Sequence, residues 1–386
     1  MKQFLEKFKI SMPEYVAESY YADACAAFAD KGDGIMCFEK YNIFTYMKEH
    51  LAYLRDQLCL DKDNVIYCYL LYNAIKNDDR LAIKALSRPN EALLDEKYDI
   101  LPIFSLMNCL PEMIAEHKKL GIDQDITADT CNLFENQVQD FIDLNHRYGI
   151  SHYVTWMLGF VKCRLFRIGR FNFERIIYKA PFDVFESKNE KNKLVVLPKG
   201  VTFHRNGQIL GSIGCTDTEG SFTADIEESD LAYVGCLVEN GVCKNEKITL
   251  KKSEWQRVLT QGEKAISVHI PTGGKMTDEV CERDIARCRS VIGNAYGEFK
   301  AFYCDSWLLD PQIKTILGRE TNLTKFADRY TVFPTKSDGS GVFEYVYLLS
   351  SPTSPEKLPE KTSFGVAIKH HLMNGGHIYG AKGVFL

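Results

Sequence analysis

The chain has 386 residues, of which 45% are hydrophobic and 26% charged, and its formal net charge is -5. These proportions are ordinary for a globular protein, and the sequence has no basic run or aromatic-basic pattern, so no nucleic-acid partner is expected. No segment approaches the roughly 20 consecutive apolar residues of a membrane span, and the first residues interleave charges with apolar positions, so no signal-peptide core is expected.

Thirteen cysteines are spread along the chain, and none of them forms a Cys-x-x-Cys pair. Several lie inside apolar runs, among them Cys68, Cys109 and Cys163, which is typical of buried thiols in a reducing compartment. The adjacent His370 and His371 would point apart on a helix and could not share a metal ion. We therefore expect a cytoplasmic protein without a metal site.

A chain of this length is expected to form two domains, and the first, to about residue 165, is predicted to be helical. Its apolar residues recur at helical spacing, and its many aromatic residues follow the same spacing, which is typical of a core. No fixed repeat period appears, which argues against a helical solenoid. The predicted helices lie at residues 38–58, 65–86, 100–120, 127–148 and 151–161.

From about residue 170 the pattern changes to the alternation that is typical of strands. Asn206-Gly207 and Asn240-Gly241 are signals for tight hairpin turns, so antiparallel strands are expected around them. A short helix is predicted at 323–330, and Thr362 can cap a last helix at 362–373. The predicted strands lie at 170–178, 183–187, 194–197, 201–204, 231–238, 242–250, 331–334 and 342–349.

Residues 265–316 combine regular structure with possible chemistry. Pro271 ends an apolar run and precedes a turn-prone Gly-Gly loop, and Thr277 is a natural N-cap for the helix that ends before Gly297. The predicted elements are a strand at 265–270, a helix at 277–296, a strand at 299–304 and a helix at 307–317. This order predicts a βαβ crossover with two parallel strands.

Crossover units of this kind bind ligands beyond the carboxyl ends of their strands, where loop amides and a helix N-terminus meet an anion. Thr272, Gly273, Gly274 and Lys275 are therefore candidates for binding a phosphate-bearing cofactor. Two acidic residues in the first helical turn oppose an anion there, and Lys275 partly offsets them. The alternative is a tight crossover that binds no ligand.

Four blocks of sequence beyond residue 250 resemble a bacterial family of acyltransferase-domain proteins. They read SEWQRVL, GEKAISVHIPTGG, FYCDSWLLDPQI and LPEKTSFGVAIKHHLMNGGHI. That family is described as having a helical N-terminal domain and a C-terminal domain similar to the GNAT N-acyltransferase fold. The resemblance implies an α+β chain, with a helical N-acyltransferase N-terminal domain at 1–165 and a GNAT-like domain, a mixed β-sheet flanked by helices, at 166–386.

The resemblance also implies an activity, the transfer of an acyl group from acyl-CoA or acetyl-CoA to an unknown small-molecule acceptor. Because N-acyltransferases acylate a nitrogen, the implied acceptor group is an amine. By position, Thr272 to Lys275 falls where a GNAT-type enzyme wraps the CoA pyrophosphate in backbone amides. The usual loop of that superfamily reads R/Q-x-x-G-x-G/A, whereas this chain has PTGGKM.

Acyl transfer from a thioester to an amine needs a base, donors for the oxyanion and often an acid for the thiolate. His269 is the candidate base, because an imidazole ordinarily titrates near neutral pH. Asp305 could orient His269 or bind the amine, and Cys304 could act as an acid or a nucleophile. Trp307 and Glu174 are candidates for substrate binding.

Each of these candidates also has a structural alternative. For His269 it is a hydrogen bond within the sheet, and for Asp305 it is a cap before the following helix. For Cys304 and Trp307 it is burial in the core.

Three functions are therefore compatible with the sequence. The first is a cytoplasmic acyltransferase. The second is a thiol hydrolase, with Cys304 as the nucleophile and His269 as the base. The third is a non-catalytic ligand-binding protein that retains the GNAT-like fold. The acyl length, the acceptor and the oligomeric state are not specified by the sequence.

Overall fold

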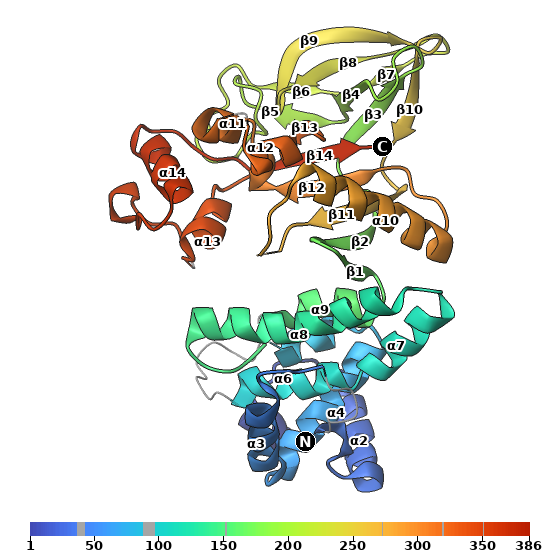
Figure 1. Cartoon of the computed structure of the whole chain (residues 1–386), viewed down its shortest axis with the longest axis vertical. Helices are drawn as coiled ribbons and strands as arrows, with labels where there is room; N and C mark the ends of the chain where they lie inside the picture. The colour runs from blue at the N-terminus through green and yellow to red at the C-terminus, as the bar shows by residue number, and fades with distance from the viewer. Residues whose placement is uncertain (37–42, 88–96, 151–152, 272, 319, 350) are drawn as a thin grey trace. The chain divides into compact units, whose positions relative to one another are not determined.

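The structure is a computed structural model that describes residues 1–36, 43–87, 97–150, 153–271, 273–318, 320–349 and 351–386 (Figure 1). The chain divides into two compact units, residues 1–168 and residues 169–386. The first unit is helical and the second is built on β-sheets with flanking helices. The predicted α+β class, with helices before a mixed sheet, is confirmed.

The helix α4 (Lys62–Lys76) forms the centre of the first unit. Its residues are buried on nearly every side from Asn64 to Ile75, and it packs against α2 and α6. Asp61 begins the helix, because its side chain accepts a hydrogen bond from the Asp63 amide. The other elements are α1 (Lys2–Lys7), α2 (Glu14–Lys31), η1 (Gly34–Met36), α3 (Lys48–Cys59), α5 (Arg80–Ser87), α6 (Lys97–Met107), α7 (Leu110–Lys119), α8 (Gln124–Asn145), α9 (Val154–Val161) and the strand β1 (Leu165–Ile168).

Two of the predicted long helices are each interrupted. The segment 65–86 breaks at Asp78, whose φ of 53° turns the chain, and Asp79 then caps α5 through the amides of Leu81 and Ala82. The segment 100–120 breaks between α6 and α7, where Pro111 lies in the first turn of the new helix. Proline is favoured there because its missing N–H would have no helical partner.

Sheet A is the sheet that carries the predicted crossover, and within the second unit its strand order is β2-β11-β12-β14-β13. Sheet B has the order β10-β3-β4-β8-β7, with β9 paired to β8, and β5 pairs with β6 in a small third sheet. The strands of sheet A are β2 (Phe171–Ile177), β11 (Lys264–His269), β12 (Phe302–Ser306), β13 (Thr331–Pro334) and β14 (Ala381–Phe385). The others are β3 (Phe182–Ser187), β4 (Leu194–Pro198), β5 (Val201–Phe203), β6 (Phe222–Ala224), β7 (Glu227–Glu228), β8 (Ala232–Glu239), β9 (Val242–Lys251) and β10 (Trp255–Leu259).

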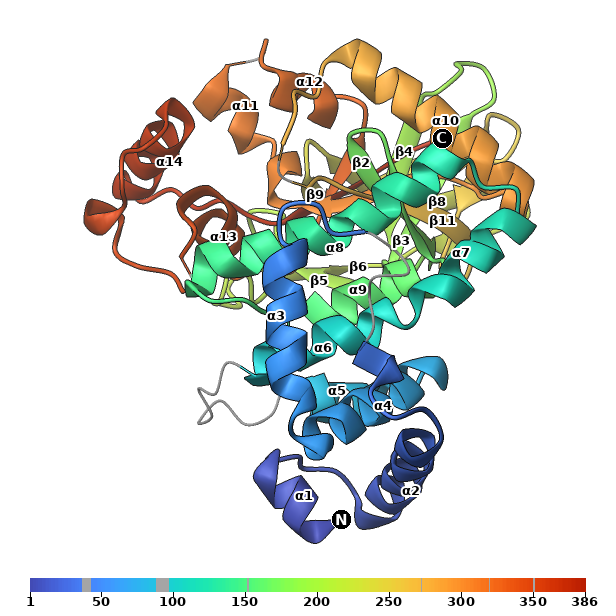
Figure 2. The same ribbon diagram turned by 60° about the horizontal axis from the view of Figure 1, so that its bottom comes forward.

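The helices of the second unit fall into two groups. The long helix α10 lies along sheet A, and α13 and α14 lie together to one side of the sheets in both views (Figures 1 and 2). The segment 342–349, predicted as a strand, is the helix α13, because its apolar residues pack in a cluster with α11 and α14. The bounds are α10 (Asp278–Tyr296), η3 (Trp307–Leu309), α11 (Gln312–Leu317), α12 (Asn322–Ala327), α13 (Gly341–Tyr347), η4 (Pro355–Lys357) and α14 (Ser363–Met373).

The strands β11 and β12 are parallel, as predicted, but they pair over a short distance. Their register joins Ile266 to Phe302 and Ser267 to Tyr303. Beyond these residues β11 continues along β2 as far as His269, and β12 continues along β14 as far as Ser306. The two parallel strands therefore stop pairing with each other at their carboxyl ends, and we call this region the open end of sheet A.

The two faces of sheet A pack against different partners. On one face, Tyr303 and Val384 join a core with residues of sheet B such as Val184. On the other face, Phe302 lies under the guanidinium of Arg289 from α10, with the Arg289 Cζ 4.9 Å from the ring centroid. We call the first the sheet B face and the second the α10 face.

Candidate functional site

A glycine loop (Gly273, Gly274 and Lys275) joins the open end of β11 to α10. Gly273 has a φ of 116°, a conformation that strains any residue with a side chain, and all three residues are exposed. Thr277 caps α10 as predicted, since its side chain accepts from the Val280 amide at 3.4 Å. Thr272, the other candidate for cofactor binding, lies outside the described residues.

Of the two acidic residues at the start of α10, Asp278 has a cationic partner that reduces its repulsion of an anion, whereas Glu279 remains ionised. Asp278 forms an ion pair with Arg329, whose Nη2 lies 2.7 Å from Asp278 Oδ1. Glu279 accepts hydrogen bonds from its own backbone amide and from Thr277, and these lower its pKa. The carboxylate of Asp278 thus has a cationic partner, and the amides of the helix start remain the local positive end of the helix dipole.

His269 and Glu174 form a hydrogen-bonded pair on the sheet B face at the open end. His269 Nε2 lies 3.1 Å from Glu174 Oε2, and the two side chains are 32% and 30% exposed. The register pairs Ser267 with Glu174, so Glu174 is a diagonal neighbour of His269 on the same face. A neutral imidazole that donates Nε2–H to a carboxylate has an unprotonated Nδ1, which is the form that can accept a proton.

A second polar group on the same face comes from β12 and β14. Asp305 Oδ2 lies 3.5 Å from Lys382 Nζ and accepts a hydrogen bond from Tyr303 Oη, also at 3.5 Å. Burial raises the pKa of Tyr303 well above its ordinary value, and the Asp305 carboxylate adds to that rise. Asp305 and His269 each lie two residues beyond the last β11–β12 pair, one on either side of the open end.

The partners of Asp305 differ from those expected of it. The carboxylate bonded to His269 is Glu174, so Glu174 is placed to orient the His269 imidazole. The cap of the following 3₁₀ helix is Ser306, whose hydroxyl accepts from the Leu308 amide at 3.2 Å. Asp305 instead holds Lys382.

Cys304 lies apart from this polar group. Alternation along β12 points Cys304 to the α10 face, whereas His269 points to the sheet B face, so the structure does not bring the two together. The Cys304 side chain is buried, and burial raises its pKa far above that of a free thiol, with the Asp305 carboxylate as a second cause. A thiolate nucleophile is therefore strongly disfavoured at this position.

Trp307 belongs to a hydrophobic cluster. Its ring stacks on Phe364 from α14, with centroids 5.8 Å apart and an interplanar angle of 18°. Around it pack residues of α11, α13 and α14, including Ile313 and Val342. These contacts fit the structural alternative for Trp307, an aromatic residue packed in the core.

Three residues near the candidate site were not anticipated from the sequence. Tyr303 and Lys382 share the sheet B face with His269, and Arg170 donates from Nε to the Gly274 carbonyl at 2.7 Å. Tyr303 is adjacent in sequence to Cys304, which was a candidate. Lys382 could not be placed near the site because the tail after α14 was not predicted to form a strand. Arg170 could not be placed there because it lies far from the glycine loop along the chain.

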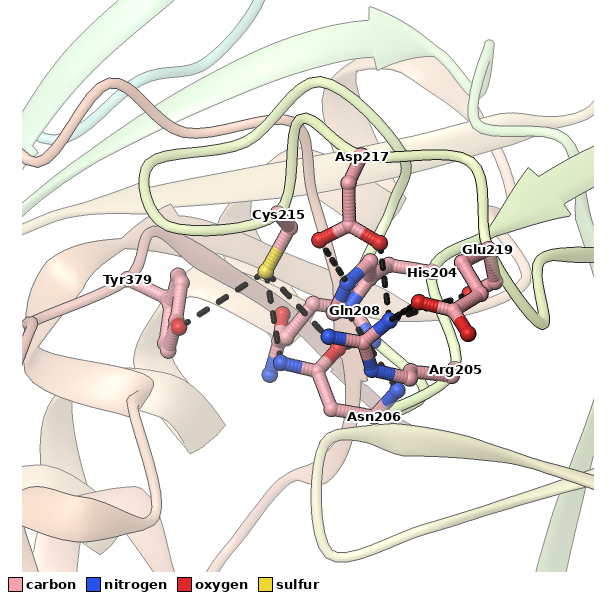
Figure 3. A network of polar contacts seen from close by, with 8 residues as sticks. All are labelled: His204, Arg205, Asn206, Gln208, Cys215, Asp217, Glu219 and Tyr379. Atoms are coloured by element: carbon pink, nitrogen blue, oxygen red, sulfur yellow. Dashed lines mark hydrogen bonds and ion pairs between the residues drawn. The ribbon is translucent and has the colours of Figure 1, made fainter.

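Another polar cluster joins the loop after β5 to the segment before β14 (Figure 3). His204, which is 5% exposed, lies with its Nε2 3.1 Å from Asp217 Oδ2, and this contact is the main cause of the lowered pKa of Asp217. The Cys215 thiol contacts the Asn206 amide at 3.3 Å and the Tyr379 hydroxyl at 3.8 Å. These contacts link two chain segments, and we interpret the cluster as structural.

A cavity of about 670 Å³ lies away from the open end. It is lined by α10 residues such as Ile285 and Arg289 and by Phe385. Phe385 pairs with Phe302 at the start of β12, which places the cavity near the opposite end of that strand from Asp305. The cavity is therefore not part of the candidate site.

The described residues contain neither a membrane-spanning helix nor a cluster of metal ligands. None of their helices has both the length and the apolar character that crossing a lipid bilayer requires. No three of their His, Cys, Asp or Glu side chains are grouped so that they could hold a metal ion.

The chain is similar to known proteins at two levels. By sequence, residues 68–163 match the model of the N-acyltransferase N-terminal domain, and residues 165–385 match that of the GNAT-like C-terminal domain. A comparison with curated protein sequences found no match. The family resemblance noted in the sequence is thus confirmed.

By structure, the chain is similar to acyltransferases solved by crystallography. One is in complex with decanoyl-CoA and teicoplanin, with 16% identity, a TM-score of 0.54, and coverage of 84% of this chain and 78% of that chain. Another is a mutant in complex with octanoyl-CoA, with 13% identity, a TM-score of 0.53, and coverage of 99% and 86%. Identities this low show a shared fold. Because the GNAT-like model covers more than half of the sequence, the chain belongs to the family of proteins with a GNAT-like C-terminal domain.

Proposed function

We propose that this protein transfers an acyl group from acyl-CoA to a small-molecule acceptor, with an amine as the attacking group. The observation that carries the proposal is the open end of sheet A, where the glycine loop follows β11 and the His269–Glu174 pair lies on the adjoining strands. Crystal structures of similar fold hold decanoyl-CoA or octanoyl-CoA, and one also holds teicoplanin, which supports an acyl-CoA donor and a small-molecule acceptor.

The proposed chemistry assigns the proton transfer to His269. The acceptor nitrogen attacks the thioester carbonyl while His269 takes its proton, and Glu174 stabilises the imidazolium that forms. A C–N bond forms as the C–S bond breaks, and the CoA thiolate leaves. Lys382, held by Asp305 on the same face, adds a positive charge that stabilises the negative charge developing on oxygen or sulfur.

The glycine loop is proposed to bind the diphosphate of CoA. Its three described residues are exposed, and a side chain at Gly273 would meet no other atom within 4 Å, so an anion could approach the backbone closely. The start of α10 follows directly and favours negative charge. A cytoplasmic location is proposed from the thiols, since the described cysteines are all free.

The thiol hydrolase is not supported by the geometry, because Cys304 and His269 point to opposite faces of sheet A. A protein that only binds acyl-CoA would show affinity without turnover. Release of free CoA in the presence of a panel of amines, followed with a thiol reagent, separates that case from the proposed transferase.

Calorimetric titration with CoA and decanoyl-CoA tests the donor site. The double variant Gly273→Val, Gly274→Val should lose binding, because valine is strained at the positive φ of Gly273 and blocks the approach of a diphosphate. Gly297→Val is the matched control, since Gly297 also has a positive φ but ends α10 far from the loop. It should bind CoA like the unmodified protein.

Two results would contradict the proposal. Unchanged affinity in the double glycine variant would reject the loop as the diphosphate site. Absence of CoA binding by the unmodified protein would reject the acyl-CoA donor altogether.

A further inference from the structure

Arg170 lies in the turn before β2, and its side chain reaches the glycine loop. Its Nε donates a hydrogen bond to the Gly274 carbonyl oxygen at 2.7 Å. The nearest atom to a Cβ built on Gly274 is the Arg170 Cδ, at 3.9 Å, so the two residues lie side by side. The turn before β2 thus supports the loop that follows β11.

This turn is itself fixed to α10. The Arg170 amide donates to Asp284 Oδ2 at 2.6 Å, and Asp284 is 1% exposed. Gly169 makes this approach possible, because its φ is 58° and a Cβ there would lie 2.2 Å from Asp284 Oδ2. The backbone of Arg170 is therefore held against α10, the helix that follows the glycine loop.

The guanidinium of Arg170 has no ion pair among the described residues. The two oxygens of Asp284, a carboxylate that raises the pKa of Arg170, are bonded to the Arg170 amide and to Arg283 Nε. The Nη1 atom of Arg170 is buried without a hydrogen-bond partner in the described structure, and burial lowers the pKa of the group. The group is satisfied only in part, by the bond from Nε to Gly274 and by the Phe171 ring, whose centroid lies 5.9 Å from Arg170 Cζ. A buried N–H donor without a partner is costly unless a ligand supplies the acceptor.

The bond to Gly274 also determines which way the loop amides face. In a planar trans peptide the carbonyl and the following N–H point in opposite directions. Because Arg170 holds the Gly274 carbonyl on its own side, the Lys275 N–H points away from Arg170.

We propose that Arg170 is the positioning residue of the diphosphate site, an inference that rests on the proposed function. It turns the Lys275 N–H toward the diphosphate of acyl-CoA, and its charge strengthens the attraction of the loop for that anion. The effect is confined to the nucleotide end of the donor, far from the thioester. Arg170 therefore sets the affinity for the donor and leaves the chemical step unchanged.

The test compares two donors that carry the same acyl group, acyl-CoA and acyl-N-acetylcysteamine, which lacks the diphosphate. In Arg170→Gln the KM for acyl-CoA should rise about 10- to 100-fold with little change in kcat, the scale of a lost charged hydrogen bond. With acyl-N-acetylcysteamine the kinetics should equal those of the unmodified protein. Arg170→Lys keeps the charge and should recover part of the loss.

Arg283→Gln is the matched control, because it removes the other hydrogen bond to Asp284 but leaves the loop contact in place. Its KM for acyl-CoA should not change. An equal loss with both donors in the Arg170 variants would indicate general structural damage and overturn the inference, as would an unchanged KM for acyl-CoA. Unmodified protein that neither binds nor uses acyl-CoA would instead reject the proposed function, and the inference with it.

Discussion

The two faces of sheet A at its open end differ in chemistry although they are built from the same strands. Along β11, Val268 is buried on the α10 face while His269 is half-buried on the sheet B face. Along β12, Cys304 is buried on the α10 face, whereas Asp305 is exposed on the sheet B face and pairs with Lys382. One residue step along a strand reverses the direction of the side chain.

This difference teaches that a reactive residue type is not enough to define a site. Cys304 and His269 are both candidates by chemistry and both lie near the carboxyl ends of parallel strands. Burial keeps the thiol neutral on one face, whereas the imidazole on the other face has a carboxylate partner. The chemistry proposed here therefore belongs to the sheet B face, and each substitution below tests that assignment.

The largest expected effect comes from His269→Ala. Loss of a general base should lower kcat about 100- to 10,000-fold, because the acceptor amine would then have to lose its proton to water. The KM for acyl-CoA should stay nearly constant, since the proposed diphosphate site is separate. Steady-state release of CoA measures both constants.

Added imidazole provides the control for His269→Ala, since it should restore part of the activity if the missing group is a base. Native circular dichroism would show that the variant is folded. A folded variant that keeps most of its kcat would remove the base from the sheet B face.

Glu174→Gln should have a smaller effect. Glutamine can still accept the hydrogen bond from His269 Nε2, but it removes the negative charge that stabilises the imidazolium during transfer. We expect a fall in kcat of about 10-fold, the scale of about 1.4 kcal/mol. Combined with His269→Ala it should add little, because the two residues act as one unit.

Additive losses in that double variant would show that Glu174 acts independently of His269. Binding of the acceptor by Glu174, its role as expected from the sequence, would then be favoured. A rise in the KM for the amine alone, with kcat unchanged, would support the same conclusion.

The sequence was sufficient to predict the crossover because its signals are local. Thr277 marks the start of α10, glycines mark its two ends, and apolar periodicity separates the helix from the strands. The pairing of His269 with Glu174 could not be predicted, because it depends on a register between strands whose residues are 95 positions apart. The turn at Asp78 was missed because a positive φ at a non-glycine residue has little sequence signal.

The smallest expected effect on activity comes from Cys304→Ala, on the α10 face. Its kcat should stay within about 2-fold of the unmodified protein, while the free energy of unfolding should fall by about 1 kcal/mol because a small buried side chain is lost. Iodoacetamide should not alkylate Cys304 in the folded protein at neutral pH, since burial strongly raises the pKa of the thiol. Denatured protein, in which every thiol reacts, provides the control. Rapid labelling of native Cys304 with loss of activity would move the chemistry to the α10 face.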